Sequence, residues 1–241
     1  MKRERLTIVS NRPVNGSVFE MKLSGTTAHK PGQFVNIALD GMFLRRPISV
    51  CDSTADSLTL LYKVVGKGTA AMSGMAPGET LDVLTGLGKG FNVDADTVKP
   101  LLVGGGIGVA PLYYLAKTLI AAGKPVSVIL GFNKADETIY RNEFEELGAK
   151  VVIATADGSE GVRGFVTDAL GEVDYDYFYA CGPMPMLRAL EKVVTTEGEV
   201  SLEERMGCGT GICMGFSCHT VLGARRVCKD GPVFSRREII W

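Results

Sequence analysis

The stretch Leu101-Leu-Val-Gly-Gly-Gly-Ile-Gly-Val-Ala-Pro111 joins an apolar run to a glycine-rich turn and then to residues that suit a helix. Glycines let a backbone approach a pyrophosphate closely, and the start of the following helix attracts its negative charge. The pattern differs from G-x-G-x-x-G because Val109 stands where the third glycine would be, and a tight turn without a ligand is the alternative. The candidate nucleotide-binding residues are Gly104, Gly105, Gly106 and Gly108.

A second turn of the same kind lies further along the chain, in Tyr179-Ala-Cys-Gly-Pro-Met-Pro-Met-Leu187. It also follows an apolar run and precedes a helical stretch, so both turns are expected at the carboxyl ends of strands, where open α/β sheets bind ligands. A small buried residue at a strand end is the alternative reading of the cysteine. Its candidate ligand-binding residues are Cys181, Gly182 and Pro183.

Around these turns, residues 98–200 alternate apolar strand candidates with helical stretches, which is typical of a doubly wound parallel sheet. The expected helices cover 110–122, 137–147, 165–170 and 185–196. Residues 1–97 instead carry short alternating segments broken by turn residues and predict an antiparallel β-barrel. Residues 201–241 form a small third segment, rich in glycine and cysteine, that is too short for a hydrophobic core of its own.

The bulk composition limits the possible functions of the 241 residues. Hydrophobic residues make up 46% and charged residues 22%, as in an ordinary folded protein. The formal net charge of −1 disfavours a nucleic-acid partner. The chain has neither a signal-peptide pattern nor an apolar run long enough for a membrane helix, so we expect a cytoplasmic protein without membrane contact.

The two turns together, Gly104-Gly-Gly-Ile-Gly-Val-Ala-Pro111 and Cys181-Gly-Pro-Met-Pro-Met186, resemble those of the ferredoxin-NADP reductase superfamily. The resemblance implies a flavin-binding barrel followed by a pyridine-nucleotide domain. It also implies that the glycine-rich turn faces the pyrophosphate and that Cys181 lies near the nicotinamide.

A flavin site in the barrel is then expected, and the sequence offers three elements for it, of which the last, Thr85-Gly-Leu-Gly-Lys-Gly-Phe91, resembles the superfamily's P-x-G-x-G-F loop. Arg46, Pro47, Ile48 and Ser49 match the superfamily's R-x-[YF]-[ST] pattern, with isoleucine in place of the aromatic residue. An arginine can pair with the flavin diphosphate through two hydrogen bonds, and serine can reach the isoalloxazine edge. The second element resembles the superfamily's ribityl- and phosphate-binding strand and turn, and its candidate residues are Leu61, Tyr62, Lys63, Gly68 and Thr69.

The choice of nicotinamide cofactor depends on the residues after the next strand. Asp136 and Glu137 stand there without an arginine, and acidic residues suit a free ribose hydroxyl better than a 2′-phosphate. NAD is therefore expected over NADP, although acids at a helix start would look the same.

Four of the six cysteines fall near the carboxyl end, with the spacing C-x4-C-x4-C-x9-C. Plant-type [2Fe–2S] proteins use C-x4-C-x2-C with a distant fourth cysteine. A zinc site is the alternative, but zinc more often uses C-x2-C pairs, and none occurs here. The predicted cluster ligands are Cys208, Cys213, Cys218 and Cys228.

This segment narrows the resemblance, because Glu203-x-x-Met-x-Cys-Gly-x-Gly-x-Cys213 and Arg226-Val-Cys-Lys-Asp-Gly-Pro-Val-Phe234 are similar to the electron-transfer subunits of type B dihydroorotate dehydrogenases. The resemblance implies FAD, a [2Fe–2S] cluster and NAD as cofactors. It also implies a heterotetramer with an FMN-containing catalytic subunit, in pyrimidine biosynthesis. No residue of this chain is assigned as catalytic for dihydroorotate, since that chemistry would belong to the partner.

Two other functions remain open from the sequence. One is a related NAD(P)H-dependent reductase subunit serving ferredoxin, a hydrogenase or sulfur metabolism. The other, from a different class, is a non-catalytic metal-binding module that senses redox state. An absorption spectrum before and after NADH would distinguish the second from the oxidoreductases.

The cysteine spacing departs from the family at one position, because the expected third ligand is Phe216, which cannot bind iron. Either the loop is re-routed around Cys218, the only cysteine close enough to replace it, or the cluster is weak or absent, and we favour the first. We therefore expect about two irons per flavin, and we expect Cys218→Ser to remove them.

Overall fold

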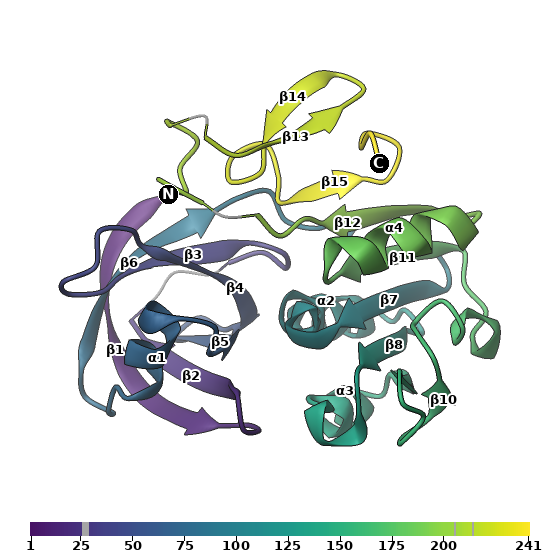
Figure 1. Cartoon of the computed structure of the whole chain (residues 1–241), viewed down its shortest axis with the longest axis horizontal. Coiled ribbons are helices and arrows are strands. Elements are labelled where there is room, and N and C mark those ends of the chain that lie inside the picture. The colour runs from purple at the N-terminus through teal and green to yellow at the C-terminus, as the bar shows by residue number, and fades with distance from the viewer. Residues whose placement is uncertain (26–28, 205, 214) are drawn as a thin grey trace.

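Figure 1 shows the computed structural model, which describes residues 1–25, 29–204, 206–213 and 215–241. The amino-terminal half is a closed antiparallel barrel with the strand order β1-β2-β5-β4-β3-β6. Alternating apolar residues such as Leu58 and Leu60 fill its interior, as the period of a half-buried strand requires. Its elements are β1 (Lys2–Pro13), β2 (Val18–Ser24), β3 (Phe34–Ala38), β4 (Arg46–Ser53), β5 (Ser57–Lys63), α1 (Lys67–Ser73) and β6 (Thr80–Leu87).

The second half is built on a seven-stranded sheet of order β10-β9-β8-β7-β11-β12-β15, in which only the pairing of β15 with β12 is antiparallel. Its strands are β7 (Pro100–Gly105), β8 (Ser127–Phe132), β9 (Lys150–Thr155), β10 (Val162–Arg163), β11 (Tyr177–Cys181), β12 (Glu197–Ser201) and β15 (Val233–Ser235). Its helices are α2 (Val109–Ala121), α3 (Arg141–Glu146) and α4 (Met184–Val193), with the short 3-10 turns η1 (Gly106–Gly108), η2 (Ala135–Glu137) and η3 (Leu170–Glu172).

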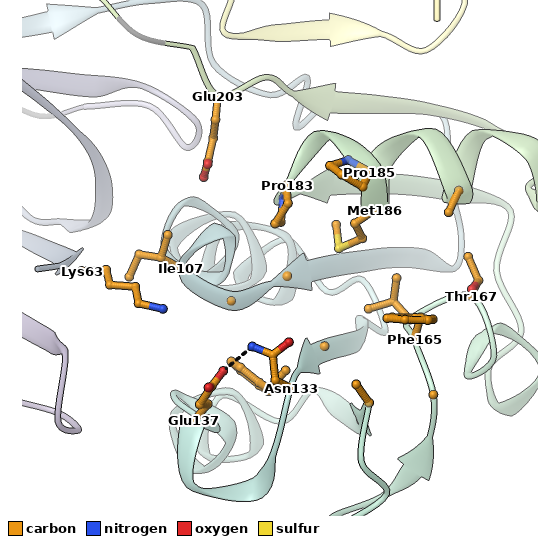
Figure 2. Close-up of a pocket in the computed structure, with 18 residues that line it drawn as sticks. Lys63, Ile107, Asn133, Glu137, Phe165, Thr167, Pro183, Pro185, Met186 and Glu203 are labelled. Carbon is orange, nitrogen blue, oxygen red and sulfur yellow. Dashed lines mark hydrogen bonds between the residues drawn. The ribbon is translucent and has the colours of Figure 1, made fainter. Parts of the chain in front are cut away.

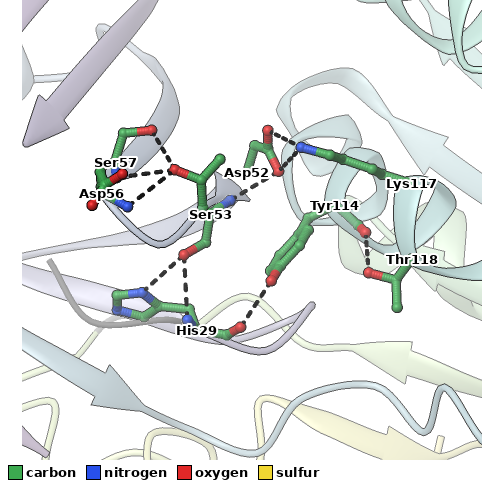
Figure 3. Close-up of polar contacts among 9 residues, drawn as sticks. His29, Asp52, Ser53, Asp56, Ser57, Tyr114, Lys117 and Thr118 are labelled. Carbon is green, nitrogen blue, oxygen red and sulfur yellow. Dashed lines mark hydrogen bonds and ion pairs between the residues drawn. The ribbon is translucent and has the colours of Figure 1, made fainter. Parts of the chain in front are cut away.

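Helix α2 lies between the barrel and the sheet (Figure 1), so one apolar core runs from Leu61 and Cys51 of the barrel to the sheet residues Leu102 and Leu130. Polar contacts strengthen this junction (Figure 3). Lys117 of α2 forms an ion pair with Asp52 at 2.7 Å, and the Tyr114 hydroxyl donates to the carbonyl of His29 at 3.0 Å. The two domains therefore meet through a packed interface rather than through a loose linker.

The cysteine-rich segment is tied to both domains. It contains the hairpin β13 (Ser217–Thr220) and β14 (Gly223–Arg226), followed by β15, which pairs with β12 and so covers an edge of the sheet. On the barrel side, Lys89 N–H donates to the carbonyl of Gly231 at 2.5 Å. The backbone of Gly88 packs closely against Pro232, because a Cβ at position 88 would stand only 2.6 Å from the proline ring. The loop 88–90 therefore contacts the carboxyl-terminal segment directly.

The predicted fold class, a flavin-type barrel with a parallel-sheet domain and a small carboxyl-terminal segment, is confirmed. One expected helix is wrong, because residues 165–170 form turns. The Asp168 carboxylate accepts from Phe165 N–H at 2.7 Å, and such side-chain bonds compete with helix formation. No helix in the described residues is both long and apolar enough to span a membrane.

Candidate redox cofactor sites

The first cavity, of about 490 Å³, opens at the carboxyl ends of β7 and β11 (Figure 2). Gly105, Gly106 and Pro183 of the two predicted turns line it. Gly108 lies behind them, where a Cβ would stand 2.3 Å from the carbonyl oxygen of Cys181. The absence of a side chain at this position therefore lets the two turns touch, which joins residues more than 70 positions apart into one ligand-facing surface.

The remaining predicted residues of these turns lie beneath the surface. A Cβ at Gly104 would pack against Leu112 at 3.2 Å, and one at Gly182 would meet the end of Met186 at 2.6 Å. These two glycines allow close packing of helix on strand, as they do in nucleotide-binding turns.

Of the two acidic residues that favoured NAD in the sequence, Glu137 lies in this cavity. Glu137 lines the cavity and accepts a hydrogen bond from the Asn133 amide at 2.8 Å (Figure 2). Asp136 instead pairs with Lys134 at the surface. Lys63 is the only cation among the described lining residues, and in Figure 2 its side chain extends from the barrel side.

The second cavity, of about 1110 Å³, lies between the barrel and the nucleotide domain. Most of the predicted flavin residues line it, namely Arg46, Pro47, Ile48, Ser49, Leu61, Tyr62, Lys63 and Thr69. Gly68 lies next to the wall, where a Cβ would stand 1.9 Å from Arg46 Nε. Only glycine leaves room at this position for the arginine to lie over the start of α1.

Arg46 donates from its guanidinium to the carbonyl of Leu44 and to Met42 Sδ, and two further predicted residues also direct their polar atoms to the protein. The Thr69 hydroxyl accepts from Val65 N–H at 2.9 Å and so holds the turn before α1. The Tyr62 hydroxyl donates to Asn11 at 2.9 Å, and burial raises the pKa of Tyr62 to about 12. Both side chains support the shape of the cavity wall.

The two cavities meet at Lys63, Ile107 and Glu203, which line both. In Figure 2, Lys63 extends from the barrel side and Glu203 extends down from the segment after β12. The surrounding protein raises the pKa of the Glu203 carboxyl, although the side chain still reaches the solvent of the cavity. Cys181 is buried at this junction, and its burial, together with the charge of Glu203, raises the pKa of its thiol, which therefore stays protonated.

The sequence did not single out Glu203, Ile107, Asn133 or Phe165 as site residues, yet all four line the nucleotide cavity. Glu203 opens the motif that precedes the cysteines, so its position in that motif was the available signal. Ile107 lies inside the glycine-rich motif, where only the glycines were singled out, and Asn133 and Phe165 belong to no motif.

Three of the four predicted cluster ligands lie near one another. Cys208 Sγ accepts hydrogen bonds from Thr210 N–H and Cys213 N–H, each at 3.4 Å. Partial burial opposes its ionisation, but these bonds outweigh burial and lower the pKa of the Cys208 thiol to about 5. Burial raises the pKa of Cys228, and the neighbouring charges of Cys208 and Cys213 raise it further.

The structure does not bring Cys218 to these three thiols. It lies on β13, where its thiol faces the carbonyl of Arg225 at 3.6 Å and packs against the core below β12 and β15. In the described part of the chain, no group of three or more His, Cys, Asp or Glu side chains is arranged to hold a metal ion. Ligation by Cys218 stays a prediction, and it would require this strand to turn over.

The cysteine loop also touches the flavin-lined part of the barrel. The buried Asn36 on β3 donates from its amide to the carbonyl of Cys208 at 3.2 Å. In the β3–β4 register, Asn36 lies opposite Pro47, one of the predicted flavin residues. One strand pair therefore borders both the flavin cavity and the cysteine loop.

These features fit the cofactors that the sequence implied. The larger cavity has a cationic wall at Arg46 and Lys67, which suits a diphosphate, and the glycine-shaped turns leave room for a second nucleotide. In the cysteine loop, backbone N–H groups already point at sulfur, as they do around iron–sulfur clusters. A barrel, a nucleotide-binding sheet and a cysteine loop in contact define a flavin- and nicotinamide-dependent oxidoreductase with an iron–sulfur centre.

Comparisons with known proteins agree with this class. Residues 203–240 match the family model "Iron-sulfur cluster binding domain of dihydroorotate dehydrogenase B", and residues 102–192 match "Oxidoreductase NAD-binding domain". The "Dihydroorotate dehydrogenase B (NAD(+)), electron transfer subunit" of Geobacillus sp. (strain WCH70) is 45% identical over 256 residues, covering 100% of this chain and 99% of the relative. The protein of the same name from Bacillus cereus (strain Q1) is 42% identical with the same coverage. The chain belongs to the family of dihydroorotate dehydrogenase B electron transfer subunits.

Solved structures show the same architecture. The NADH-dependent reduced ferredoxin-NADP oxidoreductase structure has a TM-score of 0.88 at 31% identity, covering 98% of this chain and 90% of the other. The flavohemoglobin of Malassezia yamatoensis, solved with bound FAD and heme, has a TM-score of 0.70 at 20% identity, with 80% and 56% covered, and shows the fold alone.

The predicted set of cofactors, FAD, a [2Fe–2S] cluster and NAD, is confirmed by these matches, as is the assignment to an NAD-dependent oxidoreductase. The name of the family implies a catalytic partner subunit. The alternative, a non-catalytic metal-binding module that senses redox state, receives no support from them.

Proposed function

We propose that this chain passes electrons between a nicotinamide in the smaller cavity and the FMN of a catalytic dihydroorotate dehydrogenase subunit, through FAD in the larger cavity and the cluster at the cysteine loop. The observation that carries the proposal is that the three sites adjoin one another in sequence: nucleotide cavity, flavin cavity, cysteine loop. The two cavities meet at Lys63, Ile107 and Glu203, and Asn36 joins the flavin-lined strands to Cys208.

Each site has its own set of residues in this proposal. Arg46 would bind the flavin diphosphate, with Ser49 at the isoalloxazine edge, and the backbone of Gly105 and Gly106 would cradle the pyrophosphate of NAD. When bound, the flavin exchanges a hydride with the nicotinamide and single electrons with the cluster, which is chemistry that the cofactor itself supplies.

The residues of the chain position these groups and exclude water. Cys181 and Ile107 form the apolar floor where the two cavities meet, and the raised pKa of the Cys181 thiol keeps it uncharged there. Glu137 at the far end of the nucleotide cavity disfavours a 2′-phosphate and so favours NAD over NADP. Cys208, Cys213 and Cys228 would supply three of the cluster ligands.

The partner in this proposal carries FMN, and two copies of each chain form a heterotetramer. The proposal rests on the family to which the chain belongs, and on the lack of an assigned acid or base for dihydroorotate in this chain. The complex would work in the cytoplasm, in pyrimidine biosynthesis. Six unpaired cysteines among the described residues suit a reducing compartment.

Anaerobic absorption spectroscopy of the purified chain tests the relay. NADH should bleach the flavin band within seconds, while the same concentration of NADPH should act far more slowly. With the catalytic subunit added, dihydroorotate should bleach the same band in the absence of NADH. A flavin-loaded chain that NADH leaves unbleached would contradict the nucleotide site. Bleaching by NADH, but not by dihydroorotate plus the partner, would favour the reductase alternative.

A further inference from the structure

A group of exposed apolar side chains lines one part of the larger cavity. Phe43 is fully exposed, and Leu44 and Val65 are 45% and 78% exposed, although all three line this cavity. Large apolar side chains that gather in the open beside a cavity mark a surface that binds a ligand or a partner. The position and the charged neighbours of this group indicate which ligand covers it.

Strand β4 fixes where the group lies relative to the nucleotide domain. Its carboxyl end contacts α2, because Cys51 belongs to the core that includes this helix and Asp52 pairs with Lys117. Its first residue, Arg46, lies roughly 20 Å from Asp52 along the strand. The β3–β4 connection, which carries Phe43, therefore leaves the barrel at the end of β4 that points away from α2.

Two cations stand directly beside the apolar group. The Arg46 guanidinium donates to the carbonyl of Leu44 and to Met42 Sδ, the latter at 3.0 Å, so the connection is held around the arginine. Lys67 begins α1, two residues after Val65, and lines the same cavity. An apolar surface next to paired cations suits an aromatic base that is attached to a diphosphate.

The order of the residues along β4 matches the order of the groups in FAD. Ser49 is assigned to the isoalloxazine edge and Arg46 to the diphosphate, so a dinucleotide that follows the strand in this direction brings its adenine to the residues before Arg46. The ribose that carries the adenine of NAD is assigned to Glu137 in the smaller cavity, and it does not compete for Phe43.

We infer that the ring of Phe43 stacks on the adenine of FAD, with Leu44 and Val65 beside it, and that this contact makes the chain select FAD over FMN. Aromatic side chains stack on nucleic-acid bases through the faces of both rings. FMN lacks the adenosine monophosphate half of FAD and so has no group that reaches Phe43. The inference rests on the proposed function, which places FAD in the larger cavity.

The test measures the dissociation constants of FAD and FMN for the full-length chain, by adding each flavin to flavin-stripped protein and following flavin fluorescence. Phe43→Ala should weaken the binding of FAD about tenfold, in the range of one base–aromatic stack, and leave the binding of FMN unchanged. Phe43→Trp should bind FAD at least as tightly as the parent chain, because its ring stacks over a larger area. Since Phe43 is fully exposed, both variants should fold as the parent does.

Val98→Ala is the control, because Val98 is an exposed apolar residue, at 73%, that lines neither cavity. It should change neither dissociation constant. Unchanged FAD binding in Phe43→Ala would overturn the inference, and weaker assembly with the catalytic subunit in that variant would then assign Phe43 to the protein interface.

An equal loss of FAD and FMN binding in Phe43→Ala would also overturn the inference, because the ring would then support the half of the flavin that both cofactors share. A selective loss of FAD binding supports the inference even where NADH fails to bleach the bound flavin. That second result would contradict the proposed relay alone, so the two failures can be told apart.

Discussion

At the scale of single residues, Gly108 determines how the two nucleotide-binding turns meet. Its lack of a Cβ lets η1 lie directly on the backbone of Cys181 and Gly182. The neighbouring Gly106 has a different role, because its φ of +53° is a conformation that suits glycine. Two glycines of one motif are thus required for unrelated physical reasons.

Gly108→Ala should separate the two turns, because its Cβ would stand 2.3 Å from a backbone oxygen that no rotamer can move. We expect a loss of roughly 3 kcal/mol in the free energy of unfolding, as for an overpacked core, and at least tenfold weaker NADH binding. Urea denaturation and fluorescence titration with NADH measure the two effects.

Gly171→Ala is the matched control, because a Cβ there would meet no atom within 4 Å. It should leave both measurements within error. Equal effects in the two variants would show that contact with Cys181 is not what requires glycine at position 108.

Glu137 is the residue that should set the preference for NAD. Glu137→Gln keeps a partner for the Asn133 amide but removes the charge that would oppose a 2′-phosphate. Two unit charges about 4 Å apart in water repel by ~1 kcal/mol, so NADPH should bind about fivefold more tightly, with NADH little changed. Asp136→Gln, at the surface ion pair with Lys134, should change neither dissociation constant. An unaltered NADPH affinity in Glu137→Gln would show that Glu137 does not set the preference for NAD.

At the scale of elements, the connection between the barrel and the nucleotide domain includes a buried hydrogen bond from the start of α3 to β2. Tyr140 adopts the left-handed conformation, with φ of +62°, and its hydroxyl donates to the Glu20 carboxylate at 2.6 Å. Burial and the nearby Cys51 and Glu20 raise the pKa of Tyr140, so the hydroxyl remains a donor. This contact positions one domain against the other next to the cavities.

Tyr140→Phe should destabilise the chain by about 1.5–3 kcal/mol, the usual cost of losing a buried hydrogen bond to a charged group. The midpoint of urea denaturation measures the effect. Tyr113→Phe is the control, since Tyr113 packs edge-on against Tyr140 and its hydroxyl makes no hydrogen bond to a described residue. If both variants lose equal stability, ring packing rather than the hydrogen bond to Glu20 holds this junction.

At the scale of the whole molecule, a buried carboxyl links the start of the nucleotide domain to the strand that leads to the cysteines. Glu199 on β12 accepts from Asn92 N–H at 2.8 Å and is 7% exposed. Burial raises its pKa, and the hydrogen bond from Asn92 reduces that rise. The carboxyl is therefore harder to ionise in the folded chain than in the unfolded chain.

The raised pKa of Glu199 makes the free energy of unfolding depend on pH. Above the unfolded pKa of glutamate, the unfolded chain has lost the proton that the folded chain still holds, so stability falls as pH rises through the folded pKa. Glu199→Gln should remove this contribution and flatten the fall in urea midpoint that begins above about pH 4.3, the unfolded pKa of glutamate. A variant that keeps the full slope of the parent chain would assign the effect to other groups.

Much of the molecule could be predicted from local sequence. The alternation of apolar residues predicted the barrel strands, and the glycine turns marked the carboxyl ends of β7 and β11. The helix expected at 165–170 failed because the side chain of Asp168 bonds to the backbone there. The pairing of β15 with β12 could not be read from sequence, since it depends on the path of a long irregular segment.

The sequence by itself determined the order of the domains, the two nucleotide-binding turns and the presence of a cysteine cluster site, because these depend on spacing along the chain. Only the tertiary structure decided that Glu203 and Lys63 line both cavities and that Thr69 holds its own turn. It also decided that Cys218 packs against the core of the nucleotide domain, with its thiol at the carbonyl of Arg225. The direction of a side chain depends on strand register and on contacts between distant segments, and neighbouring letters of a sequence do not encode either.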